Sequence, residues 1–178
     1  MRYPLTATVS RFGRLDIVHN NAGISGSNDF TADIEEDEFD RVVAVNFKAV
    51  WLCMKCAIEQ MLEQGGGVIV NTASALALTV RQDSATYNAT KHAVAGLTKT
   101  ADLEYASRNI RINAIFPGVI RTVMLNNHSN LAELVALPPI GQQGEVEEVV
   151  KAVLWLASED VCFMHGSLLS VDGDWTAH

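Results

Sequence analysis

Apolar residues in this chain form short continuous runs separated by longer segments with helical spacing. The runs are LDIVHNN, VIVNTAS, IRINAIFPG and LLSVDG, and each ends at polar or turn-forming residues. Strands that are buried on both faces of a parallel sheet are nearly continuous in apolar residues. These runs therefore predict four parallel strands.

The segments between the runs have the composition and end signals of helices. TATVSRFG predicts a short helix that ends at Gly13. Residues 35–64 open with acidic residues and stop at GGG, and residues 84–107 and EVEEVVKAVLWLAS predict two more helices. Alternating strands and helices indicate an α/β fold, a doubly wound parallel sheet with helices on both faces. The length of 178 residues fits one domain, residues 1–178.

Residues 123–144 mix polar and apolar positions without one clean period. We expect a loop with a short helix that closes over a substrate. Its side chains suggest a partly apolar small molecule and include Met124, Leu125, His128, Leu131, Leu134, Leu137 and Ile140.

The net charge of −8 and the pI of about 5.0 argue against nucleic acid or an anionic membrane as the main partner. They do not exclude an anionic cofactor, because backbone donors bind phosphate on acidic proteins too. No apolar run approaches the ~18 residues of a membrane span, and the first residues lack a signal-peptide core. We expect a soluble cytoplasmic protein. Cys53 and Cys56 form a CxxC within a predicted helix. Cys162 is the only other cysteine, so a four-cysteine site is impossible and we expect no metal site.

Candidate chemistry centres on the stretch SATYNATK. Tyr87 and Lys91 are four positions apart, so they share one helix face. A phenol has a pKa of about 10, and a nearby ammonium lowers it toward the range of acid–base catalysis. Ser74 ends the preceding strand and is expected to hydrogen-bond the same substrate oxygen. Asn46, among apolar neighbours, is expected to anchor a backbone or water link to Lys91.

Each of these features has an ordinary structural explanation when taken alone. A tyrosine and a lysine at this spacing are common on solvated helix faces, and a strand-end serine or NNAG is typical of a turn. The order and spacing of the whole set are specific. The set resembles the short-chain dehydrogenase/reductase family, through NNAG at 20–23, Asn46, Ser74, YNATK at 87–91, PGVIRT at 117–122 and the final LLSVDG.

The resemblance implies a Rossmann-like fold and a role for each matching residue. Tyr87 would be the general acid in carbonyl reduction and the general base in alcohol oxidation. Lys91 would lower its pKa and bind the nicotinamide ribose, Ser74 would orient the substrate oxygen, and Asn46 would support a proton relay through water. The cofactor, NAD or NADP, would be contacted by Asn20, Asn21, Ala22, Gly23, Tyr87, Lys91, Pro117, Gly118, Ile120 and Thr122.

The glycine-rich phosphate loop of the family, which follows its first strand, has no counterpart ahead of NNAG. The chain matches the family pattern from its third helix onward, so we expect an N-terminally truncated sheet of four strands that lacks roughly 60–80 residues. The strand LDIVHNN would then be an edge strand. Three explanations remain open: a fragment of a longer gene, which we favour, association with another copy, or a degraded relative.

The leading functional hypothesis is an oxidoreductase that interconverts a secondary alcohol and a ketone with NAD(P)(H). The alternative is a non-catalytic fragment or pseudoenzyme that folds and oligomerises without cofactor. The short length and PGVIRT argue against a third hypothesis, an epimerase or dehydratase. The resemblance implies a homodimer or homotetramer built on the helices at 35–64 and 84–107. The sequence decides neither the substrate nor the choice between NAD and NADP.

Overall fold

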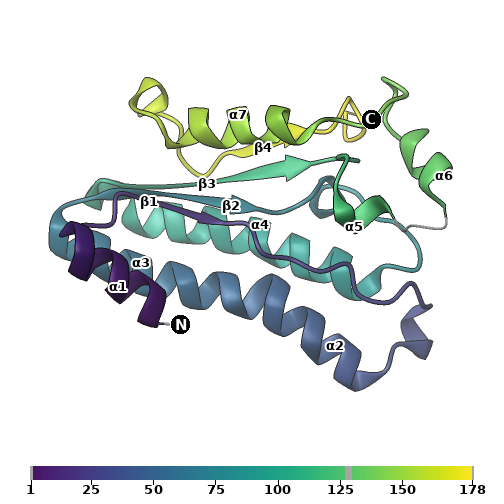
Figure 1. The fold of residues 1–178 in the computed structure, drawn as a ribbon, viewed down its shortest axis with the longest axis horizontal. Coiled ribbons are helices and arrows are strands. Elements are labelled where there is room, and N and C mark those ends of the chain that lie inside the picture. Colours follow the sequence, from purple (N-terminus) through teal and green to yellow (C-terminus); the bar gives the residue numbers. More distant parts are fainter. Residues whose placement is uncertain (1, 127–129, 178) are drawn as a thin grey trace.

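A computed structural model of the chain describes residues 2–126 and 130–177 (Figure 1). Its centre is a sheet of β1 (Ile17–Asn20), β2 (Gly67–Thr72), β3 (Ile110–Pro117) and β4 (Leu168–Val171). The strands lie in chain order, and all three pairings are parallel. The four predicted parallel strands and the α/β fold are therefore confirmed.

The helices end close to the expected positions, but α1 begins at Arg2, before the predicted start at Thr6. Arg2–Phe12 forms α1, Glu36–Val43 and Ala49–Gln64 form α2 and α3, Ala85–Tyr105 forms α4, and Val146–Ala157 forms α7. A π-helical turn, η2 (Ala44–Lys48), joins α2 to α3 without a break. The long helix ends at Gly65, which has φ of 90° and takes the left-handed cap that glycine favours.

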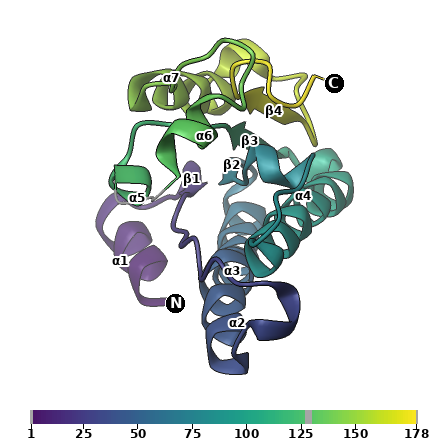
Figure 2. The same ribbon diagram turned by 90° about the vertical axis from the view of Figure 1, so that its right-hand side faces the viewer.

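The sheet separates two apolar cores. The larger one lies where α1, α3 and α4 cover one face, and it includes Met54, Met61, Ile69, Ile112 and Phe116. The smaller one lies under α7 on the other face and includes Val70, Ile115, Val153 and Leu156. Figure 2 shows α7 on one side of the strands, with α3 and α4 on the opposite side. The two cores explain why β2 and β3 are apolar at nearly every position.

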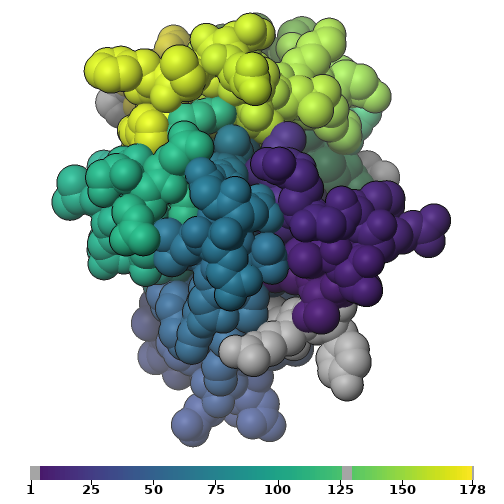
Figure 3. Space-filling model, turned by 90° about the vertical axis from the view of Figure 1, so that its left-hand side faces the viewer, coloured from purple at the N-terminus to yellow at the C-terminus, as the bar shows by residue number. Residues whose placement is uncertain are grey.

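The parallel order brings the carboxyl ends of the strands to one edge of the molecule, which faces the viewer in Figure 2. Asn20 pairs with Asn71, Thr72 with Ile115, and Pro117 with Val171. Ligands of open α/β sheets bind at this edge, outside the strand ends. Figure 3 views the molecule from the other end, where the strands begin and α1 lies at the surface.

The predicted substrate segment contains two short helices, α5 (Val123–Asn126) and α6 (Leu131–Val135). His128, one of its expected side chains, lies outside the described residues. The base of the segment is closed by a parallel bridge between Ile120 and Gly144. None of the helices in residues 2–126 and 130–177 combines the length and apolarity needed to cross a membrane.

Candidate active site

Tyr87 lies in the first turn of α4. Its side chain shares a hydrogen bond with Ser74. Burial raises the pKa of the Tyr87 phenol, and the hydrogen bond with Ser74 and the charge of Arg81 act in the opposite direction. The expected lowering of this pKa is therefore not found, because desolvation of the phenolate outweighs the groups that favour it.

Lys91 is one turn farther along α4 and is 3% exposed. Its ammonium donates to the carbonyl oxygen of Thr72 at 3.0 Å and lies 5.6 Å from the centroid of the Tyr87 ring. Burial lowers the pKa of Lys91 to about 8. Among the described residues the ammonium has one hydrogen-bond acceptor, so it retains donors with which Lys91 can bind a further oxygen atom.

Ser74 follows β2 and caps the short helix η3 (Ala75–Ala77). Its hydroxyl accepts from the Leu76 amide at 3.2 Å. Because this bond uses the oxygen as an acceptor, the hydroxyl proton remains available to Tyr87 or to a substrate oxygen. The strand end and its cap thus fix the Ser74 oxygen next to the start of α4.

Asn46 is fully buried in the π-helical turn, the kind of helix irregularity that occurs at functional sites. Its amide exchanges two hydrogen bonds with the backbone of Ile24, both at 2.8 Å, and lies 3.4 Å from the Thr90 hydroxyl. No direct hydrogen bond joins Asn46 to Lys91 among the described residues, and the expected backbone or water link stays a prediction. The two side chains meet at Gly23, where a Cβ would lie 3.4 Å from Lys91 Nζ and 3.5 Å from Asn46 Oδ1.

The NNAG turn starts from a hydrogen-bonded strand end. Asn20 donates to Asn71 at 2.8 Å, and Asn71 in turn donates to Thr98 at 2.9 Å. Asn21 and Ala22 are exposed beyond the strand. The turn therefore exposes the backbone and side chains of Asn21 and Ala22 at the sheet edge, while the hydrogen bond to Asn71 fixes Asn20.

The turn after β3 offers backbone groups for a ligand. Gly118 packs so closely that a Cβ would lie 2.7 Å from Asp172 Cα, which explains a glycine here. Val119 and Arg121 bond to Gly144, whereas no backbone hydrogen bond within the described residues uses the amide or carbonyl of Ile120. A free donor and acceptor on one residue match the carboxamide of a nicotinamide, so this turn fits the expected cofactor. Thr122, half-buried, leads into α5.

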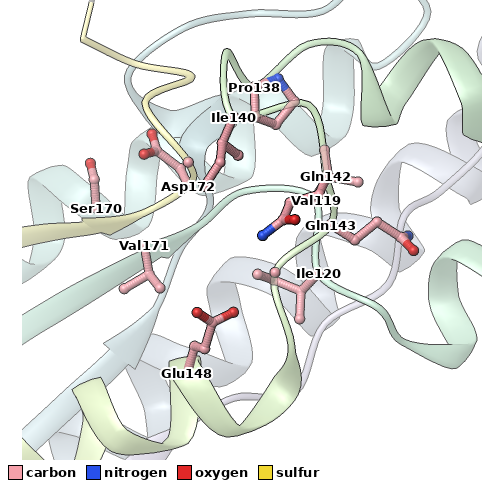
Figure 4. Close-up of a pocket in the computed structure, with 12 residues that line it drawn as sticks. Val119, Ile120, Pro138, Ile140, Gln142, Gln143, Glu148, Ser170, Val171 and Asp172 are labelled. Carbon is pink, nitrogen blue, oxygen red and sulfur yellow. The ribbon is translucent and has the colours of Figure 1, made fainter.

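A pocket of about 300 Å³ adjoins this turn (Figure 4). It is bounded by Ile120, the 138–144 segment, the end of β4 and α7, from which Glu148 points toward it. Ser74, Tyr87 and Lys91 do not line it. The pocket is thus a neighbour of the sheet-edge site and not the site itself.

The structure brings Asn46, Ser74, Tyr87 and Lys91 to one end of the sheet, beside NNAG. Sequence reasoning missed two contributors, Thr72, whose carbonyl holds Lys91, and Arg81, whose charge acts on Tyr87. Backbone acceptors leave no mark in a sequence. Arg81 offered only a weak signal, as the one basic residue between Ser74 and Tyr87.

The comparisons with known proteins agree with this geometry. The family model described as enoyl-(acyl carrier protein) reductase matches residues 4–176. Cyclohexanol dehydrogenase of Acinetobacter sp. (strain SE19) is 43% identical over 99% of this chain and 70% of that protein. The chain belongs to the short-chain dehydrogenase/reductase family. It is thus a member of a family of NAD(P)-dependent oxidoreductases, as the sequence indicated.

Solved structures of the family superpose on nearly the whole chain. Levodione reductase has a TM-score of 0.95 at 36% identity, with 99% of this chain and 72% of that chain covered. ElxO with NADP bound has a TM-score of 0.94 at 35% identity and covers 99% of this chain and 73% of that chain. The chain therefore spans about 70% of the length of these short-chain dehydrogenase/reductase relatives.

Proposed function

We propose that this protein interconverts a secondary alcohol and a ketone by hydride transfer with NAD(H) or NADP(H). The observation that carries the proposal is the grouping of the Ser74 hydroxyl, the Tyr87 phenol and the Lys91 ammonium at the carboxyl edge of the sheet. An ionisable phenol next to a hydroxyl donor and a cation is suited to moving a proton to or from an alcohol oxygen.

Tyr87 donates its proton to the carbonyl oxygen during reduction and recovers it from the alcohol during oxidation. Ser74 hydrogen-bonds the same oxygen and holds it against the phenol. Lys91 stabilises the phenolate, and its spare donors would hold the cofactor ribose. Asn46 fixes the backbone at Ile24. A bound nicotinamide dinucleotide supplies or accepts the hydride.

Residues from two turns would hold that cofactor. Asn20 to Gly23 would contact it from the β1 side, together with Tyr87 and Lys91. Pro117, Gly118, Ile120 and Thr122 would contact the nicotinamide, with the unpaired amide and carbonyl of Ile120 on its carboxamide. Titration of the chain with NADH and with NADPH tests this assignment. Micromolar binding, about −8 kcal/mol, supports it, and no binding at millimolar cofactor would favour the non-catalytic alternative.

The substrate we propose is a small, largely apolar secondary alcohol or its ketone. Leu78, Val80 and Val123 are exposed apolar side chains on the segments that follow Ser74 and PGVIRT. The similarity to cyclohexanol dehydrogenase favours an alcohol of this size. Cyclohexanol and cyclohexanone are therefore the first compounds to assay with each cofactor.

Replacement of Tyr87 by phenylalanine tests the acid–base role. Tyr87→Phe removes the proton donor and is expected to lower kcat by about 10²–10⁴-fold. Tyr105→Phe, at the other end of α4 and half-buried, is the matched control and should leave kcat unchanged. Turnover by Tyr87→Phe at the parent rate would remove Tyr87 from the mechanism.

We also propose that the protein is a homodimer or homotetramer built on α2, α3 and α4. Large apolar side chains are exposed on these helices, with Phe39 at 45%, Trp51 at 44% and Leu103 at 85%. Exposed apolar groups of this kind mark interaction surfaces. A molar mass of 19.3 kDa in light scattering at micromolar concentration would contradict the proposal.

A further inference from the structure

Arg81 lies in the segment that joins Ser74 to the start of α4, and its side chain bonds to residues from two separate segments. Its guanidinium donates twice to the Ser84 hydroxyl, at 3.1 Å and 2.7 Å, and once to Asn28 Oδ1 at 3.2 Å. Its own carbonyl accepts from Asn88 at 2.7 Å. The side chain thus connects the loop after NNAG to the first turn of α4, which carries Tyr87.

Arg81 forms no ion pair within residues 2–126 and 130–177, unlike Arg14, Arg41 and Arg121. The acidic residue nearest to it in the sequence is Asp83, whose buried Oδ1 has no hydrogen-bond partner among the described residues. The charge of Arg81 is felt instead by the Tyr87 phenol, on which no carboxylate acts. The cations facing that phenol are therefore Arg81, from the segment before α4, and Lys91, from α4 itself.

The two cations differ in how long they stay charged. The pKa of Lys91 is lowered to about 8 by burial, so Lys91 loses its charge as the solution becomes alkaline. A guanidinium stays protonated throughout this range. A lysine ammonium and a guanidinium beside the same phenol therefore differ in kind, because only the lysine can lose its charge near neutral pH.

We propose that Arg81 is a second cationic positioning residue of the Tyr87 site, which stabilises the phenolate and holds the Asn28 loop against the start of α4. The inference rests on the acid–base role proposed for Tyr87. It adds a cation that reaches the proton donor from the segment before α4, where hydrogen bonds to Ser84 and Asn28 hold it.

The test uses 3,5-difluorotyrosine at position 87, because ring fluorination brings the phenol into a pH range where the fold is not threatened. The ionisation midpoint is followed by ¹⁹F NMR in the chain without added cofactor. Arg81→Gln removes the charge and should shift the midpoint upward. Arg81→Lys keeps the charge and should shift it less. Arg108→Gln, an exposed arginine beyond the other end of α4, is the matched control and should have no effect.

Two results would overturn the proposal. An unchanged midpoint in Arg81→Gln would show that the charge does not reach the phenol. Equal upward shifts in Arg81→Gln and Arg81→Lys would attribute the effect to packing instead of charge. Circular dichroism identifies a variant that fails to fold, and the other variant then decides. If only Arg81→Lys folds, its ionisation midpoint must lie nearer to that of the parent protein than to that of solvent-exposed difluorotyrosine.

The positioning part of the proposal has its own readout. Hydrogen exchange in residues 24–30 should quicken in Arg81→Gln and in Asn28→Ala, and not in Arg108→Gln. Unchanged exchange in both variants would exclude the connection between the loop and α4. Neither readout requires turnover, so failure of the proposed reaction, seen as full activity in Tyr87→Phe, is distinguishable from failure of this inference.

Discussion

Helix α4 carries a buried polar cluster near each end, and the two clusters differ in how completely their groups are paired. Near its end, Asp102 accepts from the Ile112 amide at 2.8 Å and from His165 at 3.0 Å. Arg111 donates to the carbonyls of Ser158 and Met164, and Asn113 uses both ends of its amide. This cluster ties α4, β3 and the 158–167 segment together at the end of the molecule seen in Figure 3.

The cluster near the start of α4 is left incomplete. Lys91 has one protein acceptor, Tyr87 is held in a site that opposes its ionisation, and the buried Thr86 hydroxyl and Asn88 Oδ1 have no partner within the described residues. A fully paired cluster stabilises the fold, whereas unpaired buried groups cost stability. Helix α4 is therefore fully hydrogen-bonded near its end and leaves polar groups unpaired near its start.

The largest expected effect is at the anchored end. Asp102→Ala leaves the Ile112 amide buried without an acceptor and breaks the pair with His165, so unfolding free energy should fall by about 3 kcal/mol. Urea denaturation measures the change. Asp102→Asn keeps an acceptor and should cost less, and Glu104→Ala, exposed two residues on, is the control. If Asp102→Ala lowered the unfolding free energy no more than Glu104→Ala, the two clusters would not differ in their contribution to stability.

At the start of α4, Lys91→Met should not lower the unfolding free energy at neutral pH, in contrast to Asp102→Ala. The pKa of Lys91 is lowered from 10.5 to about 8, so the unfolded chain binds more protons between these values and stability rises with pH across that window. Below pH 8 the lowered pKa corresponds to a net cost of roughly 3 kcal/mol for keeping the ammonium buried.

Urea unfolding of the parent and of Lys91→Met at pH 7 and pH 10 measures this dependence. The parent should gain stability at the higher pH relative to the variant, which should be at least as stable at pH 7. Lys99→Met, exposed on the same helix, corrects for other groups that titrate in this range. Parallel pH profiles for the parent and Lys91→Met would contradict the buried charge.

Thr98→Val probes the polar link between the clusters. The hydroxyl accepts from Asn71 and donates to the Val94 carbonyl, and Asn71 holds Asn20 at the NNAG turn. Valine keeps the shape and leaves the Asn71 amide with a weak sulfur acceptor at Met54, so we expect a loss of about 1 kcal/mol. Thr100→Val, exposed on the same helix, is the control. Equal chemical denaturation midpoints for both variants would exclude the link.

The smallest effect concerns the turn after β4. Asp174 has φ of 76°, a left-handed conformation that glycine adopts without cost. Its amide donates to the Asp172 side chain at 3.2 Å, a bond that Asp174→Gly retains. Asp174→Gly should therefore raise the melting temperature by a degree or two, an effect of under about 1 kcal/mol. A lower melting temperature would mean that the Asp174 side chain stabilises the fold by more than its left-handed backbone conformation destabilises it.

The sequence by itself determined the strands, the helices and the sheet edge at which the candidate site lies. Continuous apolar runs set β2 and β3, because only a strand buried on both faces needs them. GGG set the end of α3 through the left-handed conformation of Gly65. The spacing of Tyr87 and Lys91 placed them on one face, since helix geometry is local.

Only the tertiary structure decided how those residues are partnered. Asn46 bonds to the backbone of Ile24, Lys91 to the carbonyl of Thr72, and Arg81 bridges Asn28 and Ser84. These partners come from separate segments, and backbone acceptors have no residue signature. The direction of each pKa shift was likewise undecided by the sequence, because burial is a property of the packed molecule and here outweighs the charges that the sequence displays.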